Sequence, residues 1–200
     1  MEEYNARVVE LRVNIKQKHT RELVQKLDEE KKAKLTEEKT SQHVLEKHSK
    51  IILNSPTVFP LDQLYKLLCH RKVFELKHVQ DFVTPTSEQT QDWVTIAVLV
   101  YKSEIKQSSN GSNYIIFTMG DLEGVEVTFF IFGEAYTEWC KEVRGSVLAI
   151  LNALPLPVKD NRQNYKIEKA SKVLKIGNSA FYAGCGGIDG IERCDGYVNV

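Results

Sequence analysis

The stretch from residue 92 to residue 177 constrains the fold most, because short runs of aromatic and β-branched residues alternate there with turn residues. These runs predict four strands and a broken fifth strand, at residues 93–101, 114–119, 125–132, 145–151, and 165–167 with 173–176. The pair Asn110-Gly111 favours a hairpin after the first strand, since both residues tolerate positive φ. Residues 133–142 lose the alternation and place their apolar residues on one helical face. The expected order is three strands, a helix and two strands.

This element order is that of the OB-fold, a partly open Greek-key barrel of five strands whose face and two loops bind oligonucleotides or oligosaccharides. A β-sandwich or an SH3-like barrel would share most of the order. We therefore expect a mainly β chain in which residues 92–177 form a five-stranded OB-fold barrel. The fold alone names no ligand.

The first 55 residues contain neither proline nor glycine and are rich in charged side chains, which is typical of a helix. Pairs such as Glu46 with Lys50 have the acid-first i,i+4 spacing that supports a solvated helix. A coiled coil is a second interpretation, although Lys18 interrupts its apolar seam, and residues 9–15 also alternate as a strand would. We expect a charged helical arm over residues 1–55, with a homo-oligomer formed through it in the coiled-coil interpretation.

Residues 56–91 begin a new segment, because Pro56 and Pro60 lack the amide proton that a continuing helix needs. The segment is expected to hold a short amphipathic helix, a docking element and a polar linker, at residues 61–70, 73–76 and 84–91.

The charges of the chain balance, with 27 Lys and Arg against 27 Asp and Glu, so a nucleic-acid site would have to be local. Apolar runs are far shorter than the roughly 20 residues of a spanning helix, and the N-terminus shows no targeting signal, so we expect no membrane association. Four scattered cysteines are too few for a disulfide framework, which favours a reducing, intracellular compartment.

A basic stripe runs from residue 159 to residue 175 and holds six Lys or Arg against two acids. Lysines and aromatic rings on the first two strands add to it, and single-strand binding requires this combination of phosphate contacts and stacking rings. The predicted nucleic-acid site consists of Lys102, Lys106, Tyr114, Phe117, Lys166, Lys169 and Lys172. In the alternative interpretation the rings are core and the lysines are solvated. At least two of Phe129, Phe130 and Phe132 are expected in the core, since alternation cannot expose all three.

Five blocks of sequence follow one another in a distinctive order and spacing, at residues 92–95, 121–122, 129–134, 145–153 and 172–177. Together they resemble the conserved central domain of the minichromosome maintenance ten family of eukaryotic DNA replication factors. The resemblance covers residues 71 to 200. It implies a nuclear factor of replication initiation whose OB-fold binds single-stranded DNA, with duplex DNA as a second ligand. It also implies a scaffold for replicative helicase and primase-polymerase components.

The same resemblance implies a zinc finger directly after the OB-fold, built in the family from three cysteines and one histidine. Cys185 and Cys194 match its first half, and a structural zinc site normally takes four protein ligands. Residues 178–200 are therefore expected to form the first half of a zinc-finger-like segment, with zinc as the cofactor. Without the resemblance, the two cysteines would be interpreted as unpaired thiols.

Catalytic motifs are missing from the sequence, which has no P-loop, no His-Glu-x-x-His and no Gly-x-Ser-x-Gly. Cys69 and His70 are adjacent, and adjacent side chains on a helix diverge instead of facing one another. Cys140 is expected to pack in the core. We expect a protein that is not an enzyme. An RNA-binding OB-fold adaptor and a coiled-coil protein-interaction module remain open as alternative functions.

Overall fold

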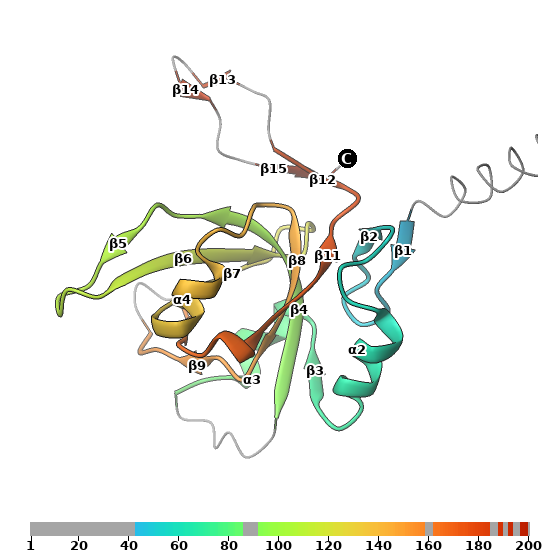
Figure 1. Ribbon diagram of the computed structural model, residues 1–200, viewed down its shortest axis with the longest axis horizontal. Helices are drawn as coiled ribbons and strands as arrows, with labels where there is room; N and C mark the ends of the chain where they lie inside the picture. The colour runs from blue at the N-terminus through green and yellow to red at the C-terminus, as the bar shows by residue number, and fades with distance from the viewer. Residues whose placement is uncertain are drawn as a thin grey trace, which may run out of the picture. The chain divides into compact units, whose positions relative to one another are not determined.

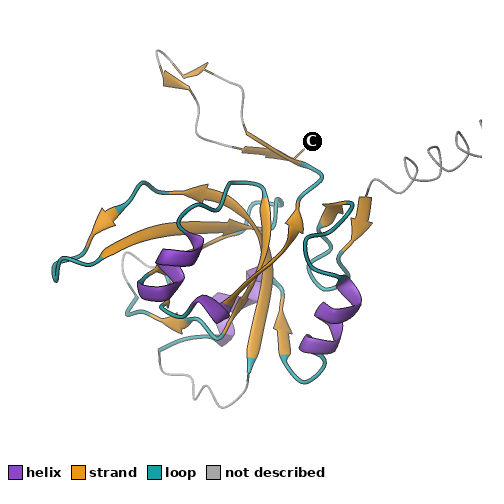
Figure 2. Ribbon diagram, in the orientation of Figure 1, coloured by secondary structure: helices purple, strands orange, loops and turns teal. Residues whose placement is uncertain are grey.

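The computed structural model describes residues 43–85, 92–158 and 162–184, and the short strands at residues 188–189, 192–193 and 197–199. The described residues belong to one compact unit, which begins at residue 43. The predicted helical arm and coiled coil therefore lie mostly outside the described residues. Figures 1 and 2 show that this unit is mainly β, with short helices beside the sheet. None of the helices in the described residues is long and apolar enough to cross a membrane.

The helices of the described residues are short, and most of the described strands join one nine-stranded sheet. The helices are α2 (Leu61–Leu68), α3 (Leu76–Phe82), α4 (Gly133–Trp139) and the 3-10 helix η1 (Ala170–Lys172). The sheet consists of β3 (Lys72–Phe74), β4 (Trp93–Lys102), β5 (Lys106–Gln107), β6 (Asn113–Gly120), β7 (Glu126–Ile131), β8 (Ser146–Leu151), β9 (Leu154–Pro155), β10 (Asn164–Ile167) and β11 (Val173–Asn178). Three separate pairs are β1 (His43–Leu45) with β2 (Ile52–Asn54), β12 (Tyr182–Gly184) with β15 (Tyr197–Asn199), and β13 (Ile188–Asp189) with β14 (Glu192–Arg193).

The order of the main strands along the sheet is β11-β8-β4-β6-β7-β10-β9. The predicted sequence of three strands, a helix and two strands is confirmed, with α4 between β7 and β8. The predicted broken fifth strand is present as β10, which pairs parallel with β7, and β11, which pairs antiparallel with β8. The two halves of this strand thus lie toward opposite ends of the sheet. The hydrogen-bonded ladder of the described residues is open, so the predicted barrel is not closed by strand pairing.

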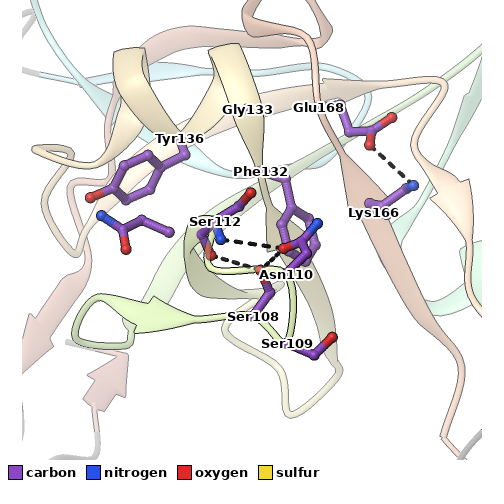
Figure 3. A pocket seen from close by; sticks show the side chains of 10 residues that line it. Ser108, Ser109, Asn110, Ser112, Phe132, Gly133, Tyr136, Lys166 and Glu168 are labelled. Atoms are coloured by element: carbon purple, nitrogen blue, oxygen red, sulfur yellow. Dashed lines mark hydrogen bonds and ion pairs between the residues drawn. The ribbon is translucent and has the colours of Figure 1, made fainter.

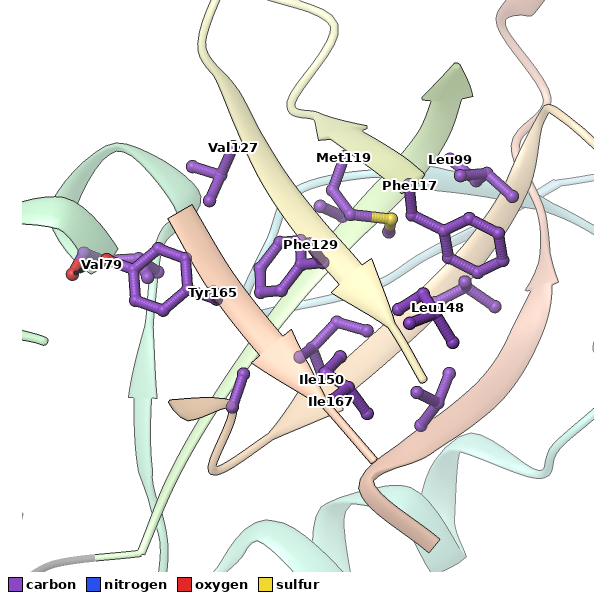
Figure 4. Close-up of a cluster of buried hydrophobic side chains, with 14 of the residues drawn as sticks. Val79, Leu99, Phe117, Met119, Val127, Phe129, Leu148, Ile150, Tyr165 and Ile167 are labelled. Atoms are coloured by element: carbon purple, nitrogen blue, oxygen red, sulfur yellow. Dashed lines mark hydrogen bonds between the residues drawn. The ribbon is translucent and has the colours of Figure 1, made fainter. Parts of the chain in front are cut away.

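The main hydrophobic core lies on the inner face of the sheet (Figure 4). Alternate residues of β6, β7 and β10 point into it, and Phe117, Phe129 and Tyr165 are fully buried there. Burial of each such side chain contributes roughly 1.5–3 kcal/mol before entropy is considered. The Tyr165 hydroxyl donates to the carbonyl oxygens of Val79 and Val83, which fixes the end of α3 over the core. Cys140 packs at the margin of this core, as predicted.

A second core covers the other face of β4 and joins it to the segment before the OB-fold. Ile51 and Leu53 from the β1–β2 hairpin are buried there with residues of α2 and the alternate residues of β4. Strand β4 is therefore buried on both faces, which explains its nearly continuous apolar sequence. Helix α2 lies within the range predicted for an amphipathic helix.

The prediction of a helix through residue 55 is wrong for residues 43–54, which form the β1–β2 hairpin. Glu46 and Lys50 do not pair as on a helix. The buried Glu46 carboxylate instead accepts hydrogen bonds from the backbone amides of His48 and Ser49, and Lys50 has a φ of 62°. The burial of Ile51 and Leu53 outweighs the helical propensity of this segment.

The docking element expected at residues 73–76 is strand β3, which pairs parallel with β4. The helix α3 that follows it was not predicted from the sequence. Its buried residues Leu76 and Val79 pack into the main hydrophobic core. This tertiary contact, and not a local sequence pattern, stabilises so short a helix. Most of the predicted linker lies outside the described residues.

Candidate nucleic-acid interface

The outer face of β6, β7 and β10 carries the residues that alternate with the core. We define the outer aromatic face as Tyr114, Ile116, Phe130, Phe132 and Lys166, all of which are half-buried. In the strand register Phe130 lies between Ile116 on β6 and Lys166 on β10. A cation therefore flanks an apolar and aromatic surface on a rigid sheet, the arrangement on which bases stack while phosphates are held.

The three rings of this face lie close to one another. Tyr114 stacks on Phe132 with ring centroids 4.9 Å apart, and Phe130 lies 6.1 Å from Tyr114 and 6.5 Å from Phe132. Beside them Lys106 of β5 is exposed, and it pairs in register with Tyr114. The three rings are half-buried, so part of each remains available to a ligand.

A hollow of about 560 Å³ adjoins this face, and Phe132 and Lys166 belong to both (Figure 3). It is lined by Ser108, Ser109, Asn110, Ser112, Asn113, Phe132, Gly133, Tyr136, Lys166 and Glu168. The loop before β6 supplies the hydroxyl and amide groups and is held by a hydrogen bond of 2.8 Å from the Ser108 hydroxyl to the Ser112 carbonyl oxygen. Gly111 in this loop has a φ of 82°, which favours glycine. Polar groups thus face aromatic rings across a space of nucleotide-sized dimensions.

One ion pair stands at this hollow, between the Lys166 ammonium and the Glu168 carboxylate at 3.2 Å. The neighbouring Lys169 is exposed at the start of η1. Of the seven residues predicted for the site, Lys106, Tyr114, Lys166 and Lys169 are thus on or beside the outer aromatic face or its hollow.

The remaining three predicted residues serve the fold. Phe117 is 0% exposed, so its prediction as a stacking ring is wrong, because its position in β6 points inward. The Lys102 ammonium donates to the carbonyl oxygens of Cys140 and Glu142 at 2.9 and 2.8 Å, and so caps the end of α4. The Lys172 ammonium donates to the Asn152 carbonyl oxygen at 2.7 Å. These two lysines bind backbone, which leaves fewer of their protons for a phosphate.

The expectation that at least two of Phe129, Phe130 and Phe132 are core is also wrong. Only Phe129 is fully buried, whereas the other two lie on the outer face. The sequence shows that residues 129 to 132 alternate between two faces of a strand. Which of them face the core is decided only by the fold. Tyr136 and the polar loop residues of the hollow were missed, since nothing in their sequence distinguishes them from a surface helix and a turn.

A second ion pair, between Lys175 and Glu142 at 2.8 Å, is more buried and lies away from the hollow. Burial of Glu142 alone would raise its pKa. Hydrogen bonds from the Lys175 ammonium, the Ser146 hydroxyl and the Val143 amide outweigh that effect and lower the pKa of this carboxyl below its usual range. Lys175, part of the predicted basic stripe, is therefore committed to the fold.

The predicted metal ligands Cys185 and Cys194 lie outside the described residues. Within the part of the chain that the structure describes, no group of three or more His, Cys, Asp and Glu side chains could hold a metal ion. The C-terminal segment is described at the β12–β15 strand pair, where the rings of Tyr182 and Tyr197 stack. The Tyr182 hydroxyl donates to the Val100 carbonyl oxygen. The zinc site stays a prediction.

Comparison with known proteins places this sheet in a family. Residues 47–174 match the model of the MCM10 OB-fold. The chain belongs to the MCM10 family. The protein MCM10 homologue of Danio rerio is 30% identical over 137 residues, which is 66% of this chain and 16% of that protein. The human homologue is 28% identical over 127 residues, 62% of this chain and 14% of that protein.

A further MCM10 relative, in Schizosaccharomyces pombe, is named DNA replication licensing factor mcm10. It is 28% identical over 101 residues, covering 48% of this chain and 17% of that protein. These relatives confirm the resemblance seen in the five sequence blocks, and the MCM10 assignment agrees with the expectation that the chain is not an enzyme. The matched region spans only about a sixth of each relative, so their activities as whole proteins come to this chain only by proposal.

Proposed function

We propose that this chain acts in DNA replication by holding single-stranded DNA on the outer aromatic face. The observation that carries the proposal is the cluster of Tyr114, Phe130 and Phe132 beside Lys166, on the sheet of an MCM10 OB-fold. Bases stack on such rings with roughly 1–3 kcal/mol each, whatever their sequence. The bases of a duplex are already stacked on one another, so the rings favour a single strand.

The hollow supplies the second part of the proposed site. A nucleotide beyond the stacked bases would place its base near Phe132 and Tyr136, with the hydroxyl and amide groups of residues 108–113 at its polar edges. Lys106, Lys166 and Lys169 would contact phosphates along the strand. The proposed site does not include Phe117, Lys102 or Lys172, which support the fold.

The wider role follows from the family. We propose a nuclear protein of replication initiation that scaffolds replicative helicase and polymerase subunits, with zinc held by the segment that includes Cys185 and Cys194. The name of the fission-yeast relative, a DNA replication licensing factor, supports the replication role for that protein and, through similarity, for this one. Self-association through the N-terminal arm belongs to the same proposal.

A titration of the whole chain with three ligands tests the proposal. Single-stranded DNA, RNA of the same sequence and duplex DNA are compared by fluorescence anisotropy at two salt concentrations. We expect the single strand to bind more tightly than the duplex, with a log-log salt slope of about −0.7 for each phosphate neutralised. Preference for RNA would favour the adaptor function. Absence of binding to all three would contradict the proposal.

A matched pair of variants locates the site. Phe130→Ala should weaken single-strand binding, whereas Leu67→Ala, which removes an exposed apolar side chain from α2, should leave it unchanged. Equal effects of the two would mean that the strand does not bind the outer aromatic face.

A further inference from the structure

The ion pair at the hollow places an acid directly on one of the proposed phosphate contacts. Lys166 and Glu168 are two residues apart, one in β10 and the other just past its end, and both line the same hollow. The ammonium and carboxylate are 3.2 Å apart, and their side chains are 32% and 55% exposed (Figure 3). A carboxylate therefore occupies the position at which Lys166 would receive an anion.

The backbone fixes Glu168 at this place. The Phe132 amide donates to the carbonyl oxygen of Ile167 at 2.8 Å, and the Ala135 amide donates to that of Glu168 at 3.0 Å. These bonds tie the end of β10 to the first turn of α4. The Glu168 side chain can rotate away from Lys166, but its attachment point at the rim of the hollow cannot move without disturbing both elements.

The pair is inexpensive to open. Ion pairs between exposed side chains contribute little to stability, because water and salt screen them. The Lys166 ammonium has three protons, and the Glu168 carboxylate engages it at 3.2 Å. A phosphate that binds Lys166 must therefore displace this carboxylate or remain close to it, and two anions at such a distance repel one another. Either effect lowers the affinity for the strand.

We propose that Glu168 competes with a nucleic-acid phosphate for Lys166 and so sets the affinity and salt dependence of the single-strand site. This inference rests on the proposed function of that site. Glu168 is a positioning residue that acts through Lys166. No sequence motif identifies it as part of the site. In this account the Lys166 contact is exchanged between an internal and an external anion as the strand binds and leaves.

The substitution Glu168→Gln tests the competition, because it keeps the size of the side chain and removes its charge. Binding of a short oligothymidylate to the whole chain should tighten about three- to fivefold at low salt, and the gain should shrink as salt rises. The matched control is Glu123→Gln, which changes net charge equally in the exposed turn between β6 and β7, at the strand ends opposite the hollow. That control should change affinity less than about 1.5-fold.

A double-variant comparison separates competition from a general charge effect. In a Lys166→Gln background, Glu168→Gln should no longer tighten binding beyond the effect of the Glu123→Gln control. Thermal melting of each variant checks that the fold is kept, and Glu168→Ala should give the same direction as Glu168→Gln.

The outcomes are distinguishable from those of the proposed function. If the unmodified chain binds the single strand and Glu168→Gln binds equally or more weakly, the competition is overturned while the function stands. An undiminished gain in the Lys166→Gln background would also overturn it. If the unmodified chain and Glu168→Gln both fail to bind, the proposed function fails and the competition falls with it.

Discussion

The inner and outer faces of β6 and β7 carry aromatic residues of the same kind at neighbouring positions, and the fold uses them differently. Phe117 and Phe129 point inward and are fully buried, whereas Tyr114, Phe130 and Phe132 point outward and are half-buried. The parity of a residue along a strand, and not its type, therefore decides whether a ring stabilises the core or is left for a ligand.

Removal of an inward-facing ring should affect stability most. Phe117→Ala should lower the free energy of unfolding by about 3–5 kcal/mol, because it leaves a cavity in the main core. Urea unfolding followed by circular dichroism measures the change. Phe117→Leu should cost less, since it fills part of the cavity. A loss below about 1 kcal/mol for the alanine variant would place Phe117 outside the core.

Removal of an outward-facing ring should affect DNA binding more than stability. Phe130→Ala should weaken single-strand binding by about 1–3 kcal/mol. It should lower the free energy of unfolding by less than Phe117→Ala does. Anisotropy titration and urea unfolding of the same preparation give both numbers. A variant that lost stability but bound DNA normally would show that the two faces do not differ in function.

Lys102 and Lys106 differ in the same way as the inward and outward rings. Lys102→Ala should lower the free energy of unfolding by about 1–3 kcal/mol, because the carbonyl oxygens of Cys140 and Glu142 lose their donor. Lys106→Ala should leave stability unchanged and reduce the salt slope of DNA binding by about 0.7. Thermal melts of the two variants measure the stability effect, and salt titrations of DNA binding measure the phosphate contact. A reversal of these roles would return Lys102 to the site.

The smallest expected effect concerns pH. The pKa of Glu142 is lowered in the folded chain, so its ionised form stabilises the fold above the ordinary carboxyl range, and this contribution is lost as pH falls through the lowered pKa. Lys175→Gln should therefore cost about 1 kcal/mol near pH 7 and less in strong acid. Unfolding measured across that range checks it, and a cost that does not change with pH would argue against the ion pair as its cause.

Much of the fold could be predicted from the sequence, because its main strands are runs of aromatic and β-branched residues bounded by turn residues. Strands β4, β6, β7 and β8 and helix α4 all lie close to the predicted ranges. The hairpin at residues 43–54 could not be predicted, since its propensity is helical and its buried apolar residues Ile51 and Leu53 join a core whose other members come from α2, β4, β8 and β11. Local pattern fails where the deciding contact is distant.

The positions of only some candidate residues could be predicted. Tyr114 of the second predicted strand and Lys166 of the basic stripe lie on the outer aromatic face. The roles of Lys102, Lys172 and Lys175 could not be predicted, because each binds a group more than 15 residues away in the chain. Charge alone does not reveal whether a lysine caps a carbonyl or faces solvent.

The position of a bound single strand on the sheet can be measured by photocrosslinking. An oligonucleotide carrying 5-iododeoxyuridine can be crosslinked by light to the whole chain and the attached peptides identified by mass spectrometry. The account predicts crosslinks on β6 and β7 at Tyr114, Phe130 or Phe132, and at Tyr136 in the hollow. Crosslinks confined to residues 43–85, with none on β6 or β7, would contradict it.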